Sequence, residues 1–140
     1  MSLTPVAAVL AVLVHDGQIL LVRRANPPDQ GLWGCPGGRI EAGETILAAA
    51  ERELREETSI EGRATRMIEA LDLFDHAPDG TLRRHFILLA IACDWVSGVP
   101  VAGDDALDAA WFAPDALRDG DPSFSAAVAR LARQAIRPPA

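Results

Sequence analysis

One stretch of the chain, residues 37–60, restricts its fold and chemistry more than any other. It reads GGRIEAGETILAAAERELREETSI, in which a glycine pair is followed by a short acidic turn and then by a run rich in Ala, Leu, Glu and Arg. These residue types favour an α-helix, so we predict a helix from about Thr45 to Thr58. Seven of the eight glutamates of the chain lie between Glu41 and Glu61. The acidic charge is therefore concentrated in one segment.

A helix here would turn part of this acidic charge toward the protein interior. At 100° per residue, Ile46 and Ala50 lie on an apolar stripe, and Glu57 falls between them. The alternative is a solvated helix with ion pairs four residues apart, such as Glu51 with Arg55. A solvated helix explains the positions of Glu51 and Arg55. It does not explain Glu57, which points toward the element that the helix packs against.

Three carboxylates crowd the end of this predicted helix, at Glu53, Glu56 and Glu57. Carboxylates at this spacing repel one another unless a cation lies among them, and burying an unpaired carboxylate costs free energy. Carboxylate oxygens are the ligands that hard divalent cations prefer. The spacing therefore predicts a metal site.

The stretch resembles the Nudix box, whose pattern is G-x5-E-x7-R-E-U-x-E-E-x-G-U, with U a bulky aliphatic residue. The chain departs from this pattern only at Ser59, where the family has glycine. The matching residues are Gly38, Glu44, Arg52, Glu53, Leu54, Glu56, Glu57 and Ile60.

The resemblance implies an enzyme that hydrolyses a nucleoside diphosphate linked to another group and that needs a divalent metal. Mg²⁺ suits this chemistry because it neutralises phosphate charge and orients the attacking water; Mn²⁺ is the alternative ion. By the same resemblance, the metal ligands are the carbonyl group of Gly37 and the carboxylates of Glu53, Glu56 and Glu57.

More than one group is a candidate for taking a proton from the attacking water. Glu53 and Glu56 are two candidates. Some relatives use a carboxylate from a later loop, which here would be Asp104 or Asp105, although an ordinary solvated loop is the alternative for that pair. Arg52 is counted with the catalytic residues because we expect it to orient a glutamate without touching the substrate.

Three arginines and a glycine are the predicted substrate-binding residues: Arg23, Arg39, Arg84 and Gly38. Arg23 ends a predicted strand and resembles family positions that reach phosphate, with a surface ion pair as the alternative. Side chains alternate along a strand, so Arg84 should face away from the side of Arg83 and His85. At most part of that trio can therefore serve one pocket, and solvent-facing strand residues are the alternative.

The composition bounds the remaining possibilities. With 140 residues the chain is long enough for one core, so we expect a single domain over residues 1–140. Its net charge of −7 argues against nucleic acid or an anionic membrane as a partner. No segment is long enough to span a bilayer, and two cysteines without metal or disulfide spacing suit the cytoplasm. The expected partner is a small nucleotide substrate, with a homodimer as the assembly to test.

Strands and turns alternate through the rest of the chain. Strands are predicted at 6–14, 18–23, 66–74, 82–95 and 107–112, followed by a helical turn at 114–117. A last helix is predicted from an N-cap at Ser123 to about Ile136. This order favours an α/β fold with a mixed β-sheet and helices on both faces. The resemblance implies the same, a Nudix-type α/β/α sandwich in which the box forms a loop–helix–loop against the sheet.

The departure at Ser59 concerns the end of the box helix. The family glycine is expected to end that helix in a left-handed conformation, in which serine pays roughly 1 kcal/mol. We therefore expect the helix to end differently, with Gly62 supplying the left-handed residue.

Two enzymatic functions and one binding function fit these observations. The first is a Mg²⁺-dependent pyrophosphohydrolase of ADP-ribose or a similar nucleotide sugar. The alternative enzyme is a (deoxy)nucleoside triphosphate pyrophosphohydrolase that cleanses the nucleotide pool, oxidised nucleotides included. A nucleotide-binding module without turnover is the third, and the intact carboxylates at 53, 56 and 57 argue against it.

Family patterns and charge favour the first of these functions. Within the family, a tyrosine after the box is typical of hydrolases of dinucleoside polyphosphates, and a proline is typical of those of ADP-ribose. The chain has no tyrosine, and its Pro78 comes a little later than the usual position. Asp104 and Asp105 would repel a triphosphate tail unless metal intervened.

Overall fold

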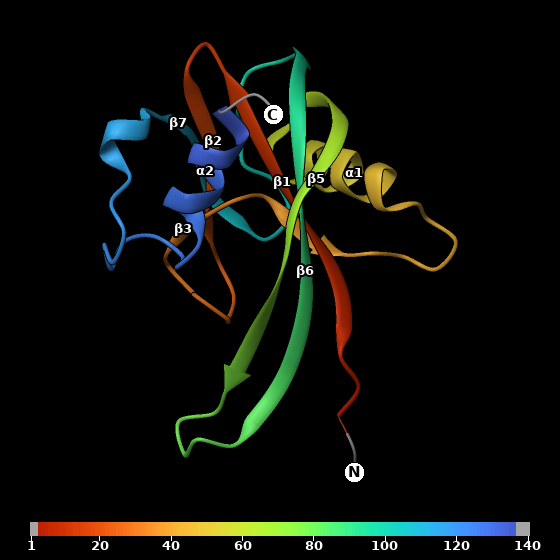
Figure 1. Cartoon of the computed structure of the whole chain (residues 1–140), viewed down its shortest axis with the longest axis vertical. Helices are drawn as coiled ribbons and strands as arrows, with labels where there is room; N and C mark the ends of the chain where they lie inside the picture. Colours follow the sequence, from red (N-terminus) through yellow and green to blue (C-terminus); the bar gives the residue numbers. More distant parts are fainter. Residues whose placement is uncertain (1–2, 137–140) are drawn as a thin grey trace.

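The computed structural model describes residues 3–136 and places them in a mixed seven-stranded sheet with a helix on each face (Figure 1). β1 runs parallel to β6 and antiparallel to β2 and β4. The strand order is β3-β2-β1-β6-β5, with β4 beside β1 and β7 beside β2. The predicted α/β fold is confirmed. The elements are β1 (Val6–His15), β2 (Gln18–Arg24), β3 (Trp33–Gly34), β4 (Gly37–Arg39), α1 (Ile46–Thr58), β5 (Glu61–His76), β6 (Leu82–Ser97), β7 (Ala106–Phe112), the 3₁₀ turn η1 (Pro114–Ala116) and α2 (Val128–Ile136).

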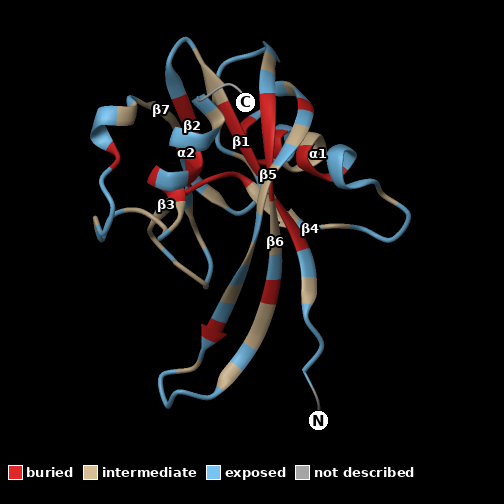
Figure 2. Cartoon of the chain, in the orientation of Figure 1, coloured by how far each residue is buried: buried red, intermediate tan, exposed pale blue. Residues whose placement is uncertain are grey.

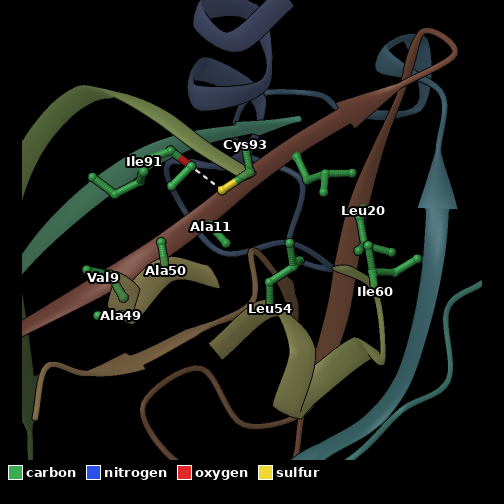
Figure 3. Packing of buried hydrophobic residues seen from close by; sticks show 11 residues of the cluster. Val9, Ala11, Leu20, Ala49, Ala50, Leu54, Ile60, Ile91 and Cys93 are labelled. Carbon is green, nitrogen blue, oxygen red and sulfur yellow. Dashed lines mark hydrogen bonds between the residues drawn. The ribbon is translucent and has the colours of Figure 1, made fainter. Parts of the chain in front are cut away.

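The middle of β1 is buried (Figure 2), and its side chains belong to two separate layers of the core. Val9 and Ala11 belong to the layer beneath α1, where they lie near Leu54 (Figure 3). Val12 points to the opposite face and joins the layer beneath α2, which includes Leu131. A strand covered on both faces needs a continuous apolar run, which is why the segment carries no charged residue before its final turn.

The two cysteines lie in different layers of this core. Cys35 packs in the layer beneath α2 and Cys93 in the layer beneath α1, and each is 4% exposed. Both are free thiols. Burial raises the pKa of each thiol to about 12.

The box helix α1 begins and ends close to its predicted positions. Thr45 is its N-cap, and the Thr45 hydroxyl accepts a hydrogen bond from the Ala48 N–H over 3.1 Å. This contact supplies one of the partners that the first N–H groups of a helix lack. The helix then continues to Thr58 without a break.

The prediction for the C-terminal end of α1 is wrong. Ser59 itself is left-handed, with φ 63° and ψ 8°, and its N–H donates to the Arg55 carbonyl oxygen. Gly62 instead lies in β5, where a Cβ atom would come within 2.5 Å of Leu54 Cδ2. That glycine is needed for close packing between β5 and α1 and does not end the helix. The Ser59 hydroxyl donates to the Val101 carbonyl oxygen over 3.4 Å.

The variant Ser59→Gly is expected to raise the free energy of unfolding by about 0.5–1 kcal/mol. The left-handed conformation costs free energy for an L-residue but not for glycine. The loss of the long hydrogen bond from the Ser59 hydroxyl to Val101 acts in the opposite direction. Urea denaturation of the two proteins side by side measures the difference. A less stable variant would show that the hydroxyl contact outweighs the backbone strain.

The predicted start of the last helix is also wrong, because α2 begins at Val128 and not after Ser123. The Trp33 N–H donates to the Ser123 carbonyl oxygen, and the Ser125 N–H donates to the Trp33 carbonyl oxygen. The chain is therefore held beside β3 at this point and cannot yet turn into a helix. None of the helices within residues 3–136 is long and apolar enough to cross a bilayer.

β5 and β6 are both longer than predicted, with 16 residues each. They pair along their whole length and extend beyond the helices as a two-stranded arm (Figure 1). The turn at the end of this arm contains residues 78–80. Its Gly80 is left-handed at φ 90°, and a Cβ atom added there would meet no heavy atom within 4 Å.

Candidate active site

The short strand β4 fixes the glycine pair of the box against the central strand. Gly37 pairs with Leu10 and Gly38 pairs with Val9 of β1. A Cβ atom at Gly37 would overlap the carbonyl oxygen of Val9, and one at Gly38 would come within 2.6 Å of the carboxyl group of Glu53. Only glycine allows β4 to approach both β1 and α1 this closely. The sequence did not predict this strand, because glycine is depleted in strands.

Glu57 is the buried carboxylate of the site, as the helical wheel predicted. It is 7% exposed, and the Gly37 N–H donates to its Oε2 over 2.7 Å. Burial raises the pKa of Glu57 to about 8; the hydrogen bond from Gly37 opposes this rise, and the charge of Glu53 adds to it. The charge of Arg24 lowers the pKa slightly. Without a cation, Glu57 therefore favours its protonated form at neutral pH.

The guanidinium group of Arg52 donates hydrogen bonds to three other carboxylates of the box, those of Glu44, Glu53 and Glu56. Its side chain is 16% exposed. The hydrogen bond that it donates lowers the pKa of Glu44 to about 2, and Glu44 in turn raises the pKa of Arg52. This arrangement is the one expected of a residue that orients glutamates. Arg52 donates from Nε to Glu44 (2.6 Å), from Nη1 to Glu53 (2.7 Å) and Glu56 (3.1 Å), and from Nη2 to the Arg39 carbonyl oxygen (3.0 Å).

The predicted metal ligands are only partly brought together. Within residues 3–136, no three His, Cys, Asp or Glu side chains are arranged to hold a metal ion. Glu53 and Glu57 both lie against the glycine pair, whereas the side chain of Glu56 is 41% exposed. The donor set nevertheless fits a hard cation, since it consists of carboxylate oxygens and includes a buried carboxyl whose charge is not fully compensated.

The family of the chain follows from its agreement with a known domain pattern. The family model of the NUDIX domain matches residues 3–132, which is nearly the whole chain. The chain belongs to the Nudix hydrolase family. Residues 38–60 are accordingly its Nudix box.

Individual Nudix relatives agree with this assignment. The ADP-ribose pyrophosphatase of Methanocaldococcus jannaschii is 37% identical over 110 residues, which cover 79% of this chain and 63% of the archaeal protein. The human (Homo sapiens) 8-oxo-dGDP phosphatase NUDT18 is 30% identical over 137 residues, which cover 94% of this chain and 41% of the human protein. The crystal structure of the MutT Nudix hydrolase from Burkholderia pseudomallei has a TM-score of 0.77 and 30% identity, covering 94% of this chain and 98% of that one. This chain spans less than two thirds of the length of the two curated relatives.

The arginine beside the Nudix box is one that the sequence did not single out. Arg24 is the basic residue whose charge acts on Glu57, and its Nε donates to the Pro28 carbonyl oxygen over 2.7 Å. The predicted Arg23 donates to the Gly31 carbonyl oxygen over 3.1 Å. Strand alternation was a usable signal, because Leu20 of the same strand packs in the layer beneath α1 and Arg24 lies four residues later.

The other predicted substrate-binding residues have varied surroundings. Arg39 is exposed, and its carbonyl group is already bonded to Arg52. Arg84 pairs at 3.0 Å with Asp75, a carboxylate that is 5% exposed. Arg83 reaches the same carboxylate at 3.0 Å, so alternation does not separate these two arginines as expected. The reason is a register shift of β5 against β6 directly after Asp75. The hydrogen bonds from Arg83 and Arg84 lower the pKa of Asp75.

The loop that carries Asp104 and Asp105 lies against the end of the Nudix helix. The Gly103 N–H donates to the Glu57 carbonyl oxygen over 3.0 Å, and the Ala25 N–H donates to the Asp105 carbonyl oxygen over 3.0 Å. Asp104 is left-handed, at φ 49°, and both aspartates are exposed. Their role as the base remains a prediction.

Proposed function

We propose that the chain is a Mg²⁺-dependent pyrophosphohydrolase that cleaves a nucleoside diphosphate linked to another group, with ADP-ribose or a similar nucleotide sugar as its substrate. The observation that carries this proposal is that the buried carboxyl group of Glu57 and the carboxyl group of Glu53 both lie against the glycine pair of the box in a Nudix-family chain. A protein gains nothing in stability from such a pair. A divalent cation bound to it would compensate the charge, and the same cation can bind phosphate oxygens.

Different residues of the chain have different roles in this reaction. Glu53, Glu56 and Glu57 would hold the ion, which when bound neutralises the pyrophosphate and acidifies a water molecule. The Gly37 N–H holds Glu57 in place, and Arg52 holds Glu53.

Hydrolysis adds the water oxygen to one phosphorus atom and breaks its bond to the bridging oxygen. A carboxylate, Glu53 or Glu56, takes the proton of the water, and Arg24 is positioned to offer positive charge to a phosphate group. The bridging oxygen leaves with the other phosphate group.

Charge supports a diphosphate substrate in preference to a triphosphate. Of the arginines that were candidates for phosphate binding, Arg83 and Arg84 share the carboxylate of Asp75. The loop next to the Nudix helix adds two exposed aspartates, at 104 and 105. A triphosphate tail needs more positive charge than such surroundings offer. The archaeal relative named as an ADP-ribose pyrophosphatase agrees with this preference.

The second candidate is hydrolysis of (deoxy)nucleoside di- or triphosphates, oxidised ones included. The observation that favours it is the match to the human 8-oxo-dGDP phosphatase, which extends over 94% of this chain. A binding module without turnover is the least supported reading, since it has no need of all three box carboxylates.

A substrate panel resolved by product chromatography tests the proposal. ADP-ribose is expected to yield AMP and ribose 5-phosphate in a reaction that needs Mg²⁺ and stops when the ion is chelated. Its kcat/KM should exceed that of every triphosphate and of 8-oxo-dGDP at equal Mg²⁺ concentration. A higher value for one of those nucleotides would reverse the order of the two enzymatic functions. Absence of Mg²⁺-dependent turnover on the whole panel would leave the binding module.

A further inference from the structure

The last turn of α1 receives its hydrogen bonds from a segment far away in the sequence. The final carbonyl groups of a helix lack partners within the helix. Here the Val101 N–H donates to the Thr58 carbonyl oxygen over 2.9 Å, and the Gly103 N–H donates to the Glu57 carbonyl oxygen over 3.0 Å. Both donors lie in the loop 98–105, which connects β6 to β7. This loop therefore contacts the backbone of the very residues that carry the box carboxylates.

Gly103 allows this contact because it has no side chain. A Cβ atom at Gly103 would come within 2.5 Å of the Glu56 carbonyl oxygen, closer than real Cβ atoms approach backbone atoms. Among residues 3–136, Gly103 is not one of the glycines with a positive φ. A left-handed backbone is therefore not the reason why this position needs glycine. Alanine could adopt the same backbone conformation, so the close approach alone requires glycine.

The other end of the same loop is bonded to the strand that carries Arg24. The Asp105 carbonyl oxygen accepts a hydrogen bond from the N–H of Ala25, the residue after Arg24. At the start of the loop, Trp95 Nε1 donates to the Gly98 carbonyl oxygen over 3.1 Å. The loop 98–105 thus joins α1, β6 and β2 at the point where the acidic and basic residues of the site meet.

We propose that the loop 98–105 positions the carboxylates of Glu56 and Glu57 for metal binding, and that Gly103 is the positioning residue on which this depends. The proposal rests on the proposed function only in taking these carboxylates as metal ligands. Displacement of the last turn of α1 by a fraction of an ångström at Glu56 would distort that turn relative to Glu53 and would move Glu57 relative to Gly37 of β4. Misplacement by about 1 Å costs on the order of 10²-fold in rate.

The variant Gly103→Ala tests the proposal, with Gly80→Ala as the matched control. Gly80 lies in the turn of the arm, and alanine there meets no atom within 4 Å but takes a left-handed φ of 90°. Both variants are therefore expected to melt at a lower temperature. Only Gly103→Ala should also weaken Mn²⁺ affinity, measured by titration calorimetry, by about 10-fold or more. Its kcat for the best substrate should fall with little change in KM.

Two outcomes would overturn the proposal. One is a folded Gly103→Ala protein with wild-type Mn²⁺ affinity. The other is measured on the wild type and covers the case that the variant does not fold. Because coupling between sites is reciprocal, saturating Mg²⁺ must slow hydrogen exchange at the Val101 and Gly103 amides, and unchanged exchange rates would contradict the coupling.

These readouts also separate this inference from the proposed function. A wild-type chain that binds Mn²⁺ but hydrolyses no pyrophosphate would end the proposed function, while the affinity comparison would still decide the role of Gly103. A wild type that binds no Mn²⁺ would overturn both.

Discussion

Replacing Glu57 by glutamine is expected to lower Mg²⁺-dependent kcat by about 100-fold or more while leaving the protein folded. Loss of an outer-shell partner alone typically costs 10–100-fold in metal affinity or activity, and we assign Glu57 as a direct ligand. Glutamine keeps a side-chain oxygen that can accept the hydrogen bond of 2.7 Å from the Gly37 N–H. It also removes a buried carboxyl whose charged form is disfavoured by burial. The melting temperature of the metal-free variant should therefore equal or exceed that of the wild type.

Glu61→Gln provides the matched control for this experiment. Glu61 lies four residues later, is about half exposed and pairs loosely with Arg55 at 3.7 Å. Its replacement removes the same charge from outside the site, so kcat and Mg²⁺ dependence should stay within a factor of two or so of the wild type, as expected for a screened surface pair. Near-normal Mg²⁺-dependent turnover in a folded Glu57→Gln protein would contradict the assignment of Glu57 as a ligand.

Replacing Arg52 by alanine is expected to cost about 2–3 kcal/mol in the free energy of unfolding and to remove most activity. Arg52 donates to Glu44, Glu53 and Glu56, and its side chain is 16% exposed. Removing one partner of a buried ion pair leaves the other partners uncompensated. The value expected here is below the range for a fully buried pair, because water reaches part of the cluster. Arg52→Lys should restore only part of the loss, since an ammonium group cannot make this set of planar contacts.

Arg55→Ala on the same helix is the control for stability. Arg55 is half exposed, and alanine suits the helix at least as well. Denaturant unfolding should place this variant within about 0.5 kcal/mol of the wild type. Equal losses for the two arginine variants would mean that helix propensity, and not the carboxylate network, accounts for the effect of Arg52.

Local regularity explains which parts of the fold could be predicted from the sequence. The box helix was predicted nearly to the residue, because its run is rich in Ala, Leu, Glu and Arg, which are good helix formers. The burial of Glu57 followed from the helical period alone. By contrast, Ser123 looks like an N-cap, yet it is held beside β3 by contacts with Trp33, which lies ninety positions earlier. Local sequence carries no information about such a partner.

The end of α1 and the arginine beside the site were missed for the same kind of reason. Ser59 is left-handed and ends α1, whereas Gly62 packs closely against Leu54 in β5, and only the folded chain shows these two roles. Arg24 emerged only from the effect of its charge on the pKa of the buried Glu57 in the folded chain. The metal ligand set stays a prediction, as do the base and the substrate contacts.

The burial of both cysteines has a practical consequence for chemical labelling. Cys35 and Cys93 are each 4% exposed, and burial holds the pKa of each thiol far above neutral pH. The reactive form of cysteine is the thiolate, so the folded chain offers maleimide reagents almost no native target. A cysteine introduced at Val99, which is 73% exposed within the loop 98–105, would therefore carry a fluorophore or spin label at a single known place. The distance from such a label to a bound paramagnetic Mn²⁺ would then report the position of that loop in solution.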